Sequence, residues 1–144
     1  MKVFFIPFIL LLVISGCSTT GMSAQEKTAA YLNFIEAEQL ESIDKIRSFR
    51  FSGWQSLNNR FLIITTSPRR KYLIDVSSHC SDLKFSQAII INQSTSTSLS
   101  TRFDSISMLD TPQLKCFIKN IYPITKEQSK ALSNIGKELK QENQ

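Results

Sequence analysis

Residues 61–76, Phe61-Leu-Ile-Ile-Thr-Thr66, Ser67-Pro-Arg-Arg70 and Lys71-Tyr-Leu-Ile-Asp-Val76, decide the fold class. The first segment is a run of apolar and β-branched residues, which is typical of a buried strand. Pro68 fixes its own φ and favours a turn. The third segment then returns with a second apolar run. This stretch predicts a β-hairpin, and the other elements are placed around it.

Short strand-like segments flank the hairpin on both sides. Apolar and polar residues alternate over residues 48–54, and Asn58-Asn59 favours a tight turn because asparagine tolerates positive φ. After the hairpin we expect a strand at 88–92, an exposed polar loop at 93–98, and one bent or two short strands at 99–109 that bury Phe103, Ile106 and Met108. A turn at 110–113 then leads to a last strand at 114–122, which Pro123 ends.

The last strand is expected to place Cys116, Ile118 and Asn120 on one face, and Phe117, Lys119 and Ile121 on the other.

Two helices are expected at the ends of this β region. Residues 25–39 carry apolar residues at helical spacing, with a face formed by Ala29, Leu32, Ile35 and Leu40 and widened by Tyr31 and Phe34; Ile43 and Ile46 prolong the pattern. Thr125 followed by Gln128 matches a capping box, and a narrow apolar stripe follows at Ala131, Leu132, Ile135 and Leu139. The expected fold is α+β and mainly β: a small antiparallel sheet of six or seven strands, curled into a barrel or sandwich, with an N-terminal and a C-terminal helix.

The N-terminal residues have the layout of a signal peptide. Lys2 precedes an apolar run, Val3–Ile14, that is shorter than the roughly 20 residues a membrane-spanning helix needs. Ile14-Ser15-Gly16-Cys17 resembles the lipobox of bacterial lipoproteins, which implies that Cys17 is acylated and becomes the first mature residue. Ser18, in place of aspartate, favours the outer membrane, facing the periplasm. The alternative is an ordinary secretory signal with Cys17 as a spare thiol.

The expected organisation is therefore a signal peptide at residues 1–16, a lipidated cysteine and flexible tether at 17–24, and one globular domain at 25–144. Lipidation of Cys17 leaves Cys80 and Cys116 of the three cysteines, and an even remainder in an oxidising compartment predicts a disulfide. A metal site formed by His79, Cys80 and Cys116 is the alternative, but adjacent residues rarely point at one ion. We expect no metal and no cofactor.

Catalytic constellations are weak in this sequence. His79 is the only histidine, and the four glycines form no phosphate-binding loop. Asp75, Asp82 and Asp104 would permit acid–base hydrolysis if two of them faced each other, although local polar contacts are the simpler role. The net charge of +5 is spread along the chain and does not predict nucleic-acid binding.

The densest basic run is Arg69-Arg70-Lys71, at the expected hairpin tip. Such a run can bind phosphate or carboxylate groups, since arginine makes bidentate contacts. A solvated hairpin end that keeps the sheet edge soluble is the alternative.

The mature part also resembles a known family. The residues that carry the likeness are Phe49-Arg50-Phe51 with Trp54, Tyr72-Leu73-Ile74, Cys80-Ser81-Asp82-Leu83, Arg102-Phe103-Asp104 and Cys116-Phe117-Ile118-Lys119-Asn120-Ile121. In this order they resemble the DUF6491 family of small proteobacterial envelope proteins of unknown function, over roughly Tyr31 to Ile124. The resemblance implies a shared fold and the disulfide, and it implies no activity, cofactor or catalytic residue.

The expected function is a non-catalytic binding or interaction module, anchored to the membrane through Cys17, with a periplasmic protein or an anionic glycolipid as partner and no nucleic acid. Two alternatives stay open: a hydrolase that acts on envelope material through clustered carboxylates, and an envelope stress component that contacts anionic glycolipid through its basic tip.

Overall fold

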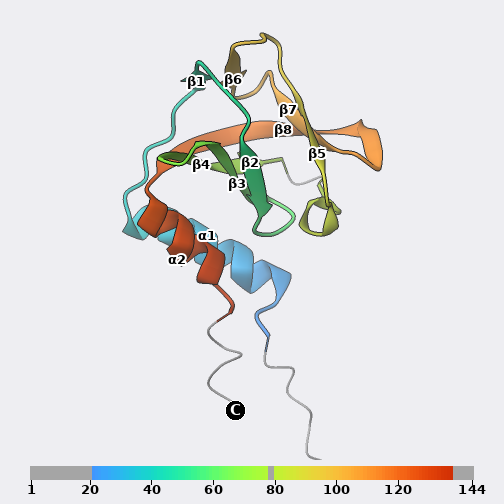
Figure 1. Ribbon diagram of the computed structural model, residues 1–144. Helices are drawn as coiled ribbons and strands as arrows, with labels where there is room; N and C mark the ends of the chain where they lie inside the picture. Colours follow the sequence, from blue (N-terminus) through green and yellow to red (C-terminus); the bar gives the residue numbers. More distant parts are fainter. Residues whose placement is uncertain (1–20, 78–79, 138–144) are drawn as a thin grey trace, which may run out of the picture.

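The computed structural model describes residues 21–77 and 80–137, which form three layers (Figure 1). The first layer holds the helices α1 (Ala24–Ala37) and α2 (Lys126–Asn134). The second is a curled antiparallel sheet of β2 (Gly53–Ser56), β3 (Phe61–Ser67), β4 (Arg70–Val76), β5 (Ile89–Asn92), β7 (Ser105–Met108) and β8 (Thr111–Ile124). The third is a small ribbon of β1 (Lys45–Arg47) and β6 (Ser98–Ser100), and a 3-10 turn, η1 (Leu83–Phe85), lies between β4 and β5.

The sheet has the strand order β2-β3-β4-β8-β7-β5 and curls into a half-barrel. The expected fold class is confirmed: two helices, mostly β, with one helix at each end of the described chain. The described residues contain eight strands, because the β1–β6 ribbon pairs apart from the six-stranded sheet. None of the helices in these residues is long and apolar enough to cross a membrane.

The expected hairpin is confirmed as β3 and β4, with Leu62 opposite Ile74 and Ile63 opposite Leu73. Leu62 and Ile74 belong to the core between the sheet and the β1–β6 ribbon, whereas Ile63 and Leu73 belong to the core beneath the helices. Both faces of the hairpin are therefore covered. This is why its sequence is a continuous apolar run and does not alternate.

Both helices begin at a capping box. The Thr125 hydroxyl accepts from the amide of Gln128, whose side chain accepts from the amide of Thr125, as expected. Ser23 and Glu26 form the same reciprocal pair at α1, so the helix begins inside the segment expected to be a tether.

The buried face of α1 differs from the expected one. Tyr31 is buried against Phe61, with ring centroids 5.6 Å apart, and Phe34 and Ile35 pack beside it. Ala29 is exposed and Leu32 is 37% exposed, so their assignment to the buried face was wrong. In α2 the stripe is carried by the buried Leu132 and the half-buried Ile135, while Ala131 is exposed and Leu139 lies outside the described residues.

The helical pattern does not continue to Ile43 and Ile46. Gln39 adopts a φ of 51° directly after the helix, which ends it. Ile43 then forms a bridge with Ile121, and Ile46 is buried in β1. Both isoleucines are spaced as in a helix but contribute to the β core.

Two strand boundaries also differ from the expected ones. The strand expected at 48–54 begins only at Gly53, and Phe51 is 47% exposed. Residues 99–109 do form two short strands, but Phe103 is 77% exposed and contributes nothing to the core.

Strand β8 is longer than expected, because it begins at Thr111 and includes Pro123. The preceding turn is only Leu109-Asp110. Pro123 lies opposite Tyr72 of β4, and pairing with β7 on the other side extends only to Phe117. A proline that lacks an amide hydrogen is tolerated where one side of the strand is free.

The face assignment within β8 was wrong for Ile121. Asp75 lies opposite Asn120 and Val76 opposite Ile118, so Lys119 is an extra residue in a β-bulge. A bulge shifts the alternation by one residue. Cys116, Ile118 and Ile121 therefore all reach the same core cluster.

Candidate anion-binding site

The β3–β4 turn carries the basic run identified in the sequence. Pro68 and Arg69 form the turn, and Arg70 is the first residue of β4. Proline cannot adopt the positive φ of the turns that best match a two-residue hairpin, and the register shifts between Thr65 and Ser67. The bulge at Thr66 absorbs the mismatch, and the side chains of Arg69 and Arg70 remain exposed.

A third arginine joins these two from a distant part of the chain. Arg50 lies in the segment between β1 and β2, and with Arg69 and Arg70 it lines a hollow of about 420 Å³. Three hydroxyl side chains, Ser48, Thr66 and Ser67, line the same hollow. Three guanidinium groups and three hydroxyls provide many donors, which suits an anion such as phosphate or carboxylate. We call this the arginine hollow.

Lys71 does not belong to the arginine hollow. Its ammonium donates to the Thr65 hydroxyl at 3.0 Å, and its backbone pairs with Ile124 of β8. The basic run of the sequence is thus divided by the alternation of the strand, and Arg50 takes the place expected for Lys71.

Two further hollows follow along the β1 segment. The first, of about 510 Å³, is lined by Lys45, Arg47, Ser48, Thr95, Thr97 and Ser98. The second, of about 360 Å³, shares Lys45 and Thr95 and adds the pair Arg102 and Phe103. The arginine hollow shares Ser48 with the first of these. The three hollows are therefore neighbours on one basic, hydroxyl-rich surface.

The positive charges on this surface have no acidic partner among residues 21–77 and 80–137. The only ion pair within 4.0 Å in these ranges joins Arg60 to Asp75, which lie elsewhere. Asp44 is the single carboxylate among the residues that line the three hollows. Six exposed cations therefore face solvent here and attract anions.

Asp104, one of the three carboxylates considered for catalysis, holds the loop that carries Arg102 and Phe103 at one end of the basic surface. It is fully buried and accepts the amides of Ser94 at 2.7 Å and Ser100 at 2.6 Å. The neighbouring Arg102 has a φ of 70° and donates its amide to the carbonyl of Ile118 at 2.8 Å. These bonds fix the loop backbone while the side chains of Arg102 and Phe103 remain exposed.

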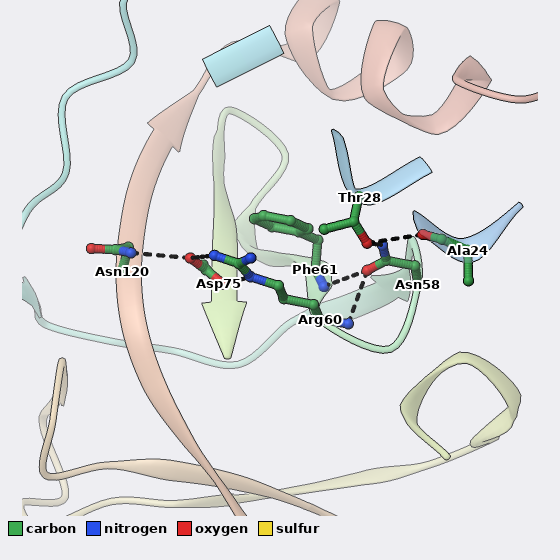
Figure 2. Close-up of polar contacts among 7 residues, drawn as sticks. All are labelled: Ala24, Thr28, Asn58, Arg60, Phe61, Asp75 and Asn120. Atoms are coloured by element: carbon green, nitrogen blue, oxygen red, sulfur yellow. Dashed lines mark hydrogen bonds and ion pairs between the residues drawn. The ribbon is translucent and has the colours of Figure 1, made fainter. Parts of the chain in front are cut away.

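Asp75 has a different environment, shown in Figure 2. Its carboxylate is 1% exposed and accepts two bonds from Arg60, from Nε at 2.7 Å and from Nη2 at 3.0 Å, and a third from Asn120 at 3.0 Å. The hydrogen bonds from Arg60 to Asp75 raise the pKa of the Arg60 guanidinium. Burial, followed by the negative charge of Asp75, raises the pKa of the nearby Tyr122 hydroxyl.

The Arg60–Asp75 pair is part of a network that joins the sheet to α1. Asn58 accepts the amides of Arg60 at 2.9 Å and Phe61 at 2.7 Å through its side-chain oxygen, which closes the β2–β3 turn. Its amide nitrogen donates to the Thr28 hydroxyl of α1 at 3.0 Å (Figure 2). The expected Asn58-Asn59 turn is thus present, but neither asparagine has a positive φ; a side-chain bond stabilises it.

The remaining candidates for chemistry do not join these groups. Asp82 is exposed and its side chain caps no amide at η1. His79 lies outside the described residues, as does Cys17. Within those residues no group of three metal-binding side chains occurs. The carboxylates Asp75 and Asp104 each contact their own set of donors.

Cys80 and Cys116 form a disulfide, with Cα atoms 5.8 Å apart. Both cysteines are fully buried in the core between the sheet and the ribbon. The bond joins the segment after β4 to β8. The pairing itself is the one that the count of cysteines predicted.

A family model described as a family of unknown function, DUF6491, matches residues 1–140 of the chain. The chain belongs to the DUF6491 family. No curated protein and no solved structure shows significant similarity to it. Membership of DUF6491 therefore supplies no activity or ligand, and the site has to be argued from its own geometry.

The sequence predicted two of the three arginines that line the arginine hollow of this DUF6491 protein, Arg69 and Arg70, but not Arg50. The missing signal is the long-range packing that carries residues 47–50 past the β3–β4 turn. One indication was available: Arg50 follows Phe49, an aromatic residue of the type that is often buried. Phe49 is indeed buried and anchors the segment.

Proposed function

We propose that this protein is a lipid-anchored, non-catalytic binding module of the bacterial envelope that holds an anionic group in the arginine hollow. The observation that carries the proposal is the convergence of Arg50, Arg69 and Arg70 on one hollow, none of them in an ion pair with a described residue. Arginine contributes bidentate donors that phosphate and carboxylate groups share. The lipobox resemblance at Cys17 supports the envelope anchor.

The hydrolase alternative receives no support from the described residues. Acid–base hydrolysis of a glycan needs two carboxyl groups on either side of the scissile bond. Asp75 is buried and bonded to Arg60 and Asn120, and Asp104 is buried and bonded to two backbone amides, so neither carboxylate faces the other or an open hollow. A binding role fits these contacts better than a catalytic one.

The anchor is tested by replacing Cys17. Cys17→Ser removes the thiol to which the lipid is attached, so we expect the acyl chains to be lost from the N-terminal peptide. Two acyl chains anchor a protein stably, since each buried CH₂ contributes about 0.8 kcal/mol. Fractionation followed by mass spectrometry of the N-terminal peptide gives the measurement. A parent protein whose N-terminal peptide carries no acyl chain would rule out the anchor.

The ligand site is tested with Arg69→Ala combined with Arg70→Ala. The probes are inorganic pyrophosphate and citrate, titrated into the detergent-extracted full chain and followed by calorimetry. Each lost charge-assisted hydrogen bond weakens binding by about 1.5–3 kcal/mol, so we expect a loss of at least about tenfold in affinity.

The control replaces Lys126 and Lys130 of α2 by alanine, which removes the same charge on the helix layer. This control should bind the probes as the parent does. Arg69→Lys with Arg70→Lys should lie between parent and alanine variant, because lysine keeps the charge and loses the planar fork. If the control with Lys126 and Lys130 replaced lost as much affinity as Arg69→Ala with Arg70→Ala, only net charge would matter, which contradicts a built site.

A further inference from the structure

We infer that the three hollows form one elongated site for an acidic glycan, a chain of sugars that carries carboxylates at intervals. The inference rests on the proposed function, since it names the ligand class of that same surface. The inference goes beyond the proposed function because it assigns Arg102 and Phe103 to the site, although neither lines the arginine hollow.

The first support is the alignment of the hollows along β1. Lys45 and Arg47 are exposed and stand on the same face of the strand, on either side of the buried Ile46. Alternate residues of a strand are about 7 Å apart, so Lys45 and Arg47 present two cations in succession along the surface. Arg50 and the β3–β4 turn continue the series at one end, and Arg102 continues it at the other. A single small anion would use only one of these positions.

The second support is the chemistry between the cations. Nine of the residues that line the three hollows are serine or threonine. Four of them are not buried and make no side-chain hydrogen bond with a described residue: Ser48, Ser67, Ser94 and Thr97. A hydroxyl both donates and accepts, and this matches sugar hydroxyls, which do the same. An acidic polypeptide has only its backbone N–H groups as regular donors, whereas a sugar chain carries hydroxyls on every residue, so the lining favours an acidic glycan.

The third support is the presentation of Phe103 beside Arg102. Phe103 is 77% exposed. Its loop is fixed by the contacts of Asp104 and by two backbone hydrogen bonds: the Thr101 amide donates to the Asp44 carbonyl at 2.9 Å, and the Arg102 amide donates to the Ile118 carbonyl. An aromatic ring held in this way provides a flat apolar surface on which the C–H face of a sugar ring packs. Because the loop is already ordered, binding does not have to order it.

The backbone of Arg102 adds a further argument. A positive φ is unfavourable for a residue with a side chain. Glycine would occupy this position without strain. An arginine here sacrifices stability, which is expected where the guanidinium is needed for binding.

The position of the surface relative to the anchor separates a glycan from the lipid headgroups of the anchoring leaflet. The described chain begins at Gly21 beside α1, in the helix layer, and the β1–β6 ribbon lies on the other side of the six-stranded sheet (Figure 1). From Cys17 to Ser23 there are 23 − 17 = 6 residue steps, which span at most about 20 Å. The anchor is therefore attached on the side of the helix layer, and the ribbon is the side of the domain farther from the point of attachment.

The experiment measures binding of galacturonate and of oligogalacturonides of increasing length to the detergent-extracted full chain. We expect affinity to rise with length until the three hollows are filled and then to level off. Arg102→Gly and Phe103→Ala should each weaken the long oligomers about tenfold, the effect of roughly one lost contact of 1.4 kcal/mol, and leave the monomer unchanged. Arg102→Gly should not lower the melting temperature, so its loss of binding cannot come from unfolding.

The control is Phe85→Ala, since Phe85 is 75% exposed but lines a different hollow together with Asp82 and Asp110. It should leave oligomer binding unchanged. Affinity independent of length overturns the inference and leaves the proposed function intact, whereas failure of every anionic probe, pyrophosphate included, overturns both. Poly-L-glutamate of equal charge, or vesicles of phosphatidylglycerol, binding more tightly than the oligomers would likewise overturn the glycan assignment.

Discussion

Replacing Arg60 by alanine should lower the free energy of unfolding by about 3 kcal/mol, the lower end of the range for breaking a buried ion pair. Asp75 is 1% exposed and would have Asn120 as its only remaining side-chain donor. The Arg60 side chain is 29% exposed, so water would enter and relieve part of the cost. Urea denaturation of the parent and the variant, followed by circular dichroism, measures the difference.

Two companion variants separate the ion pair from the contact of the Arg60 guanidinium with Phe61, whose ring centroid lies 5.1 Å from the guanidinium carbon. Arg60→Ala combined with Asp75→Asn removes both charges, so it should recover part of the loss and show a coupling energy of more than about 0.5 kcal/mol. Arg60→Lys keeps a charge but loses the bidentate geometry and should be intermediate. An Arg60→Ala protein within about 0.5 kcal/mol of the parent would mean that the pair has no structural role.

The features that could be predicted from the sequence are those set by neighbouring residues. The β3–β4 hairpin depends on two apolar runs and a proline turn within residues 61–76, and the α2 start depends on Thr125 and Gln128. The disulfide followed from the number of cysteines. None of these predictions requires knowledge of which distant segments meet.

The features that were missed depend on distant packing. The bulge at Lys119 moves Ile121 to the opposite face of β8, and no neighbouring residue in the sequence predicts a bulge there. Phe103 appears apolar enough for the core, but Asp104 fixes the loop so that the ring points outward. Helical spacing at Ile43 and Ile46 was equally misleading, because the two residues reach the core through separate contacts: Ile43 forms a bridge with Ile121, and Ile46 is buried within β1.

The composition of the site shows the same division. Arg69 and Arg70 are adjacent in the sequence and were recognised, whereas Arg50 reaches the arginine hollow only because Phe49 is buried and carries its segment past the turn. The Arg60–Asp75 pair does not follow from the hairpin register, which places Phe61 opposite Asp75 and would put the preceding side chain on the other face. Arg60 reaches the carboxylate because it lies in the β2–β3 turn, before the alternation of β3 begins.

Removing the disulfide should lower the free energy of unfolding by about 3–4 kcal/mol, because it frees a loop of 36 residues in the unfolded chain. The variant to use is Cys80→Ala with Cys116→Ala. Both positions are fully buried, and a serine hydroxyl without a partner there would add about 1–3 kcal/mol of its own.

The closed loop between the two cysteines contains η1, β5, β6 and β7, and thus also the loop that presents Arg102 and Phe103. Amide hydrogen exchange should therefore increase most in these strands when the bond is removed, since local opening follows the least constrained segment. Denaturation of the parent with and without reductant supplies the matched comparison: the reductant should destabilise the parent and leave the alanine double variant unchanged. A parent whose unfolding midpoint does not respond to reductant, or whose two thiols react with a labelling reagent before reduction, would show that the bond does not form in the protein.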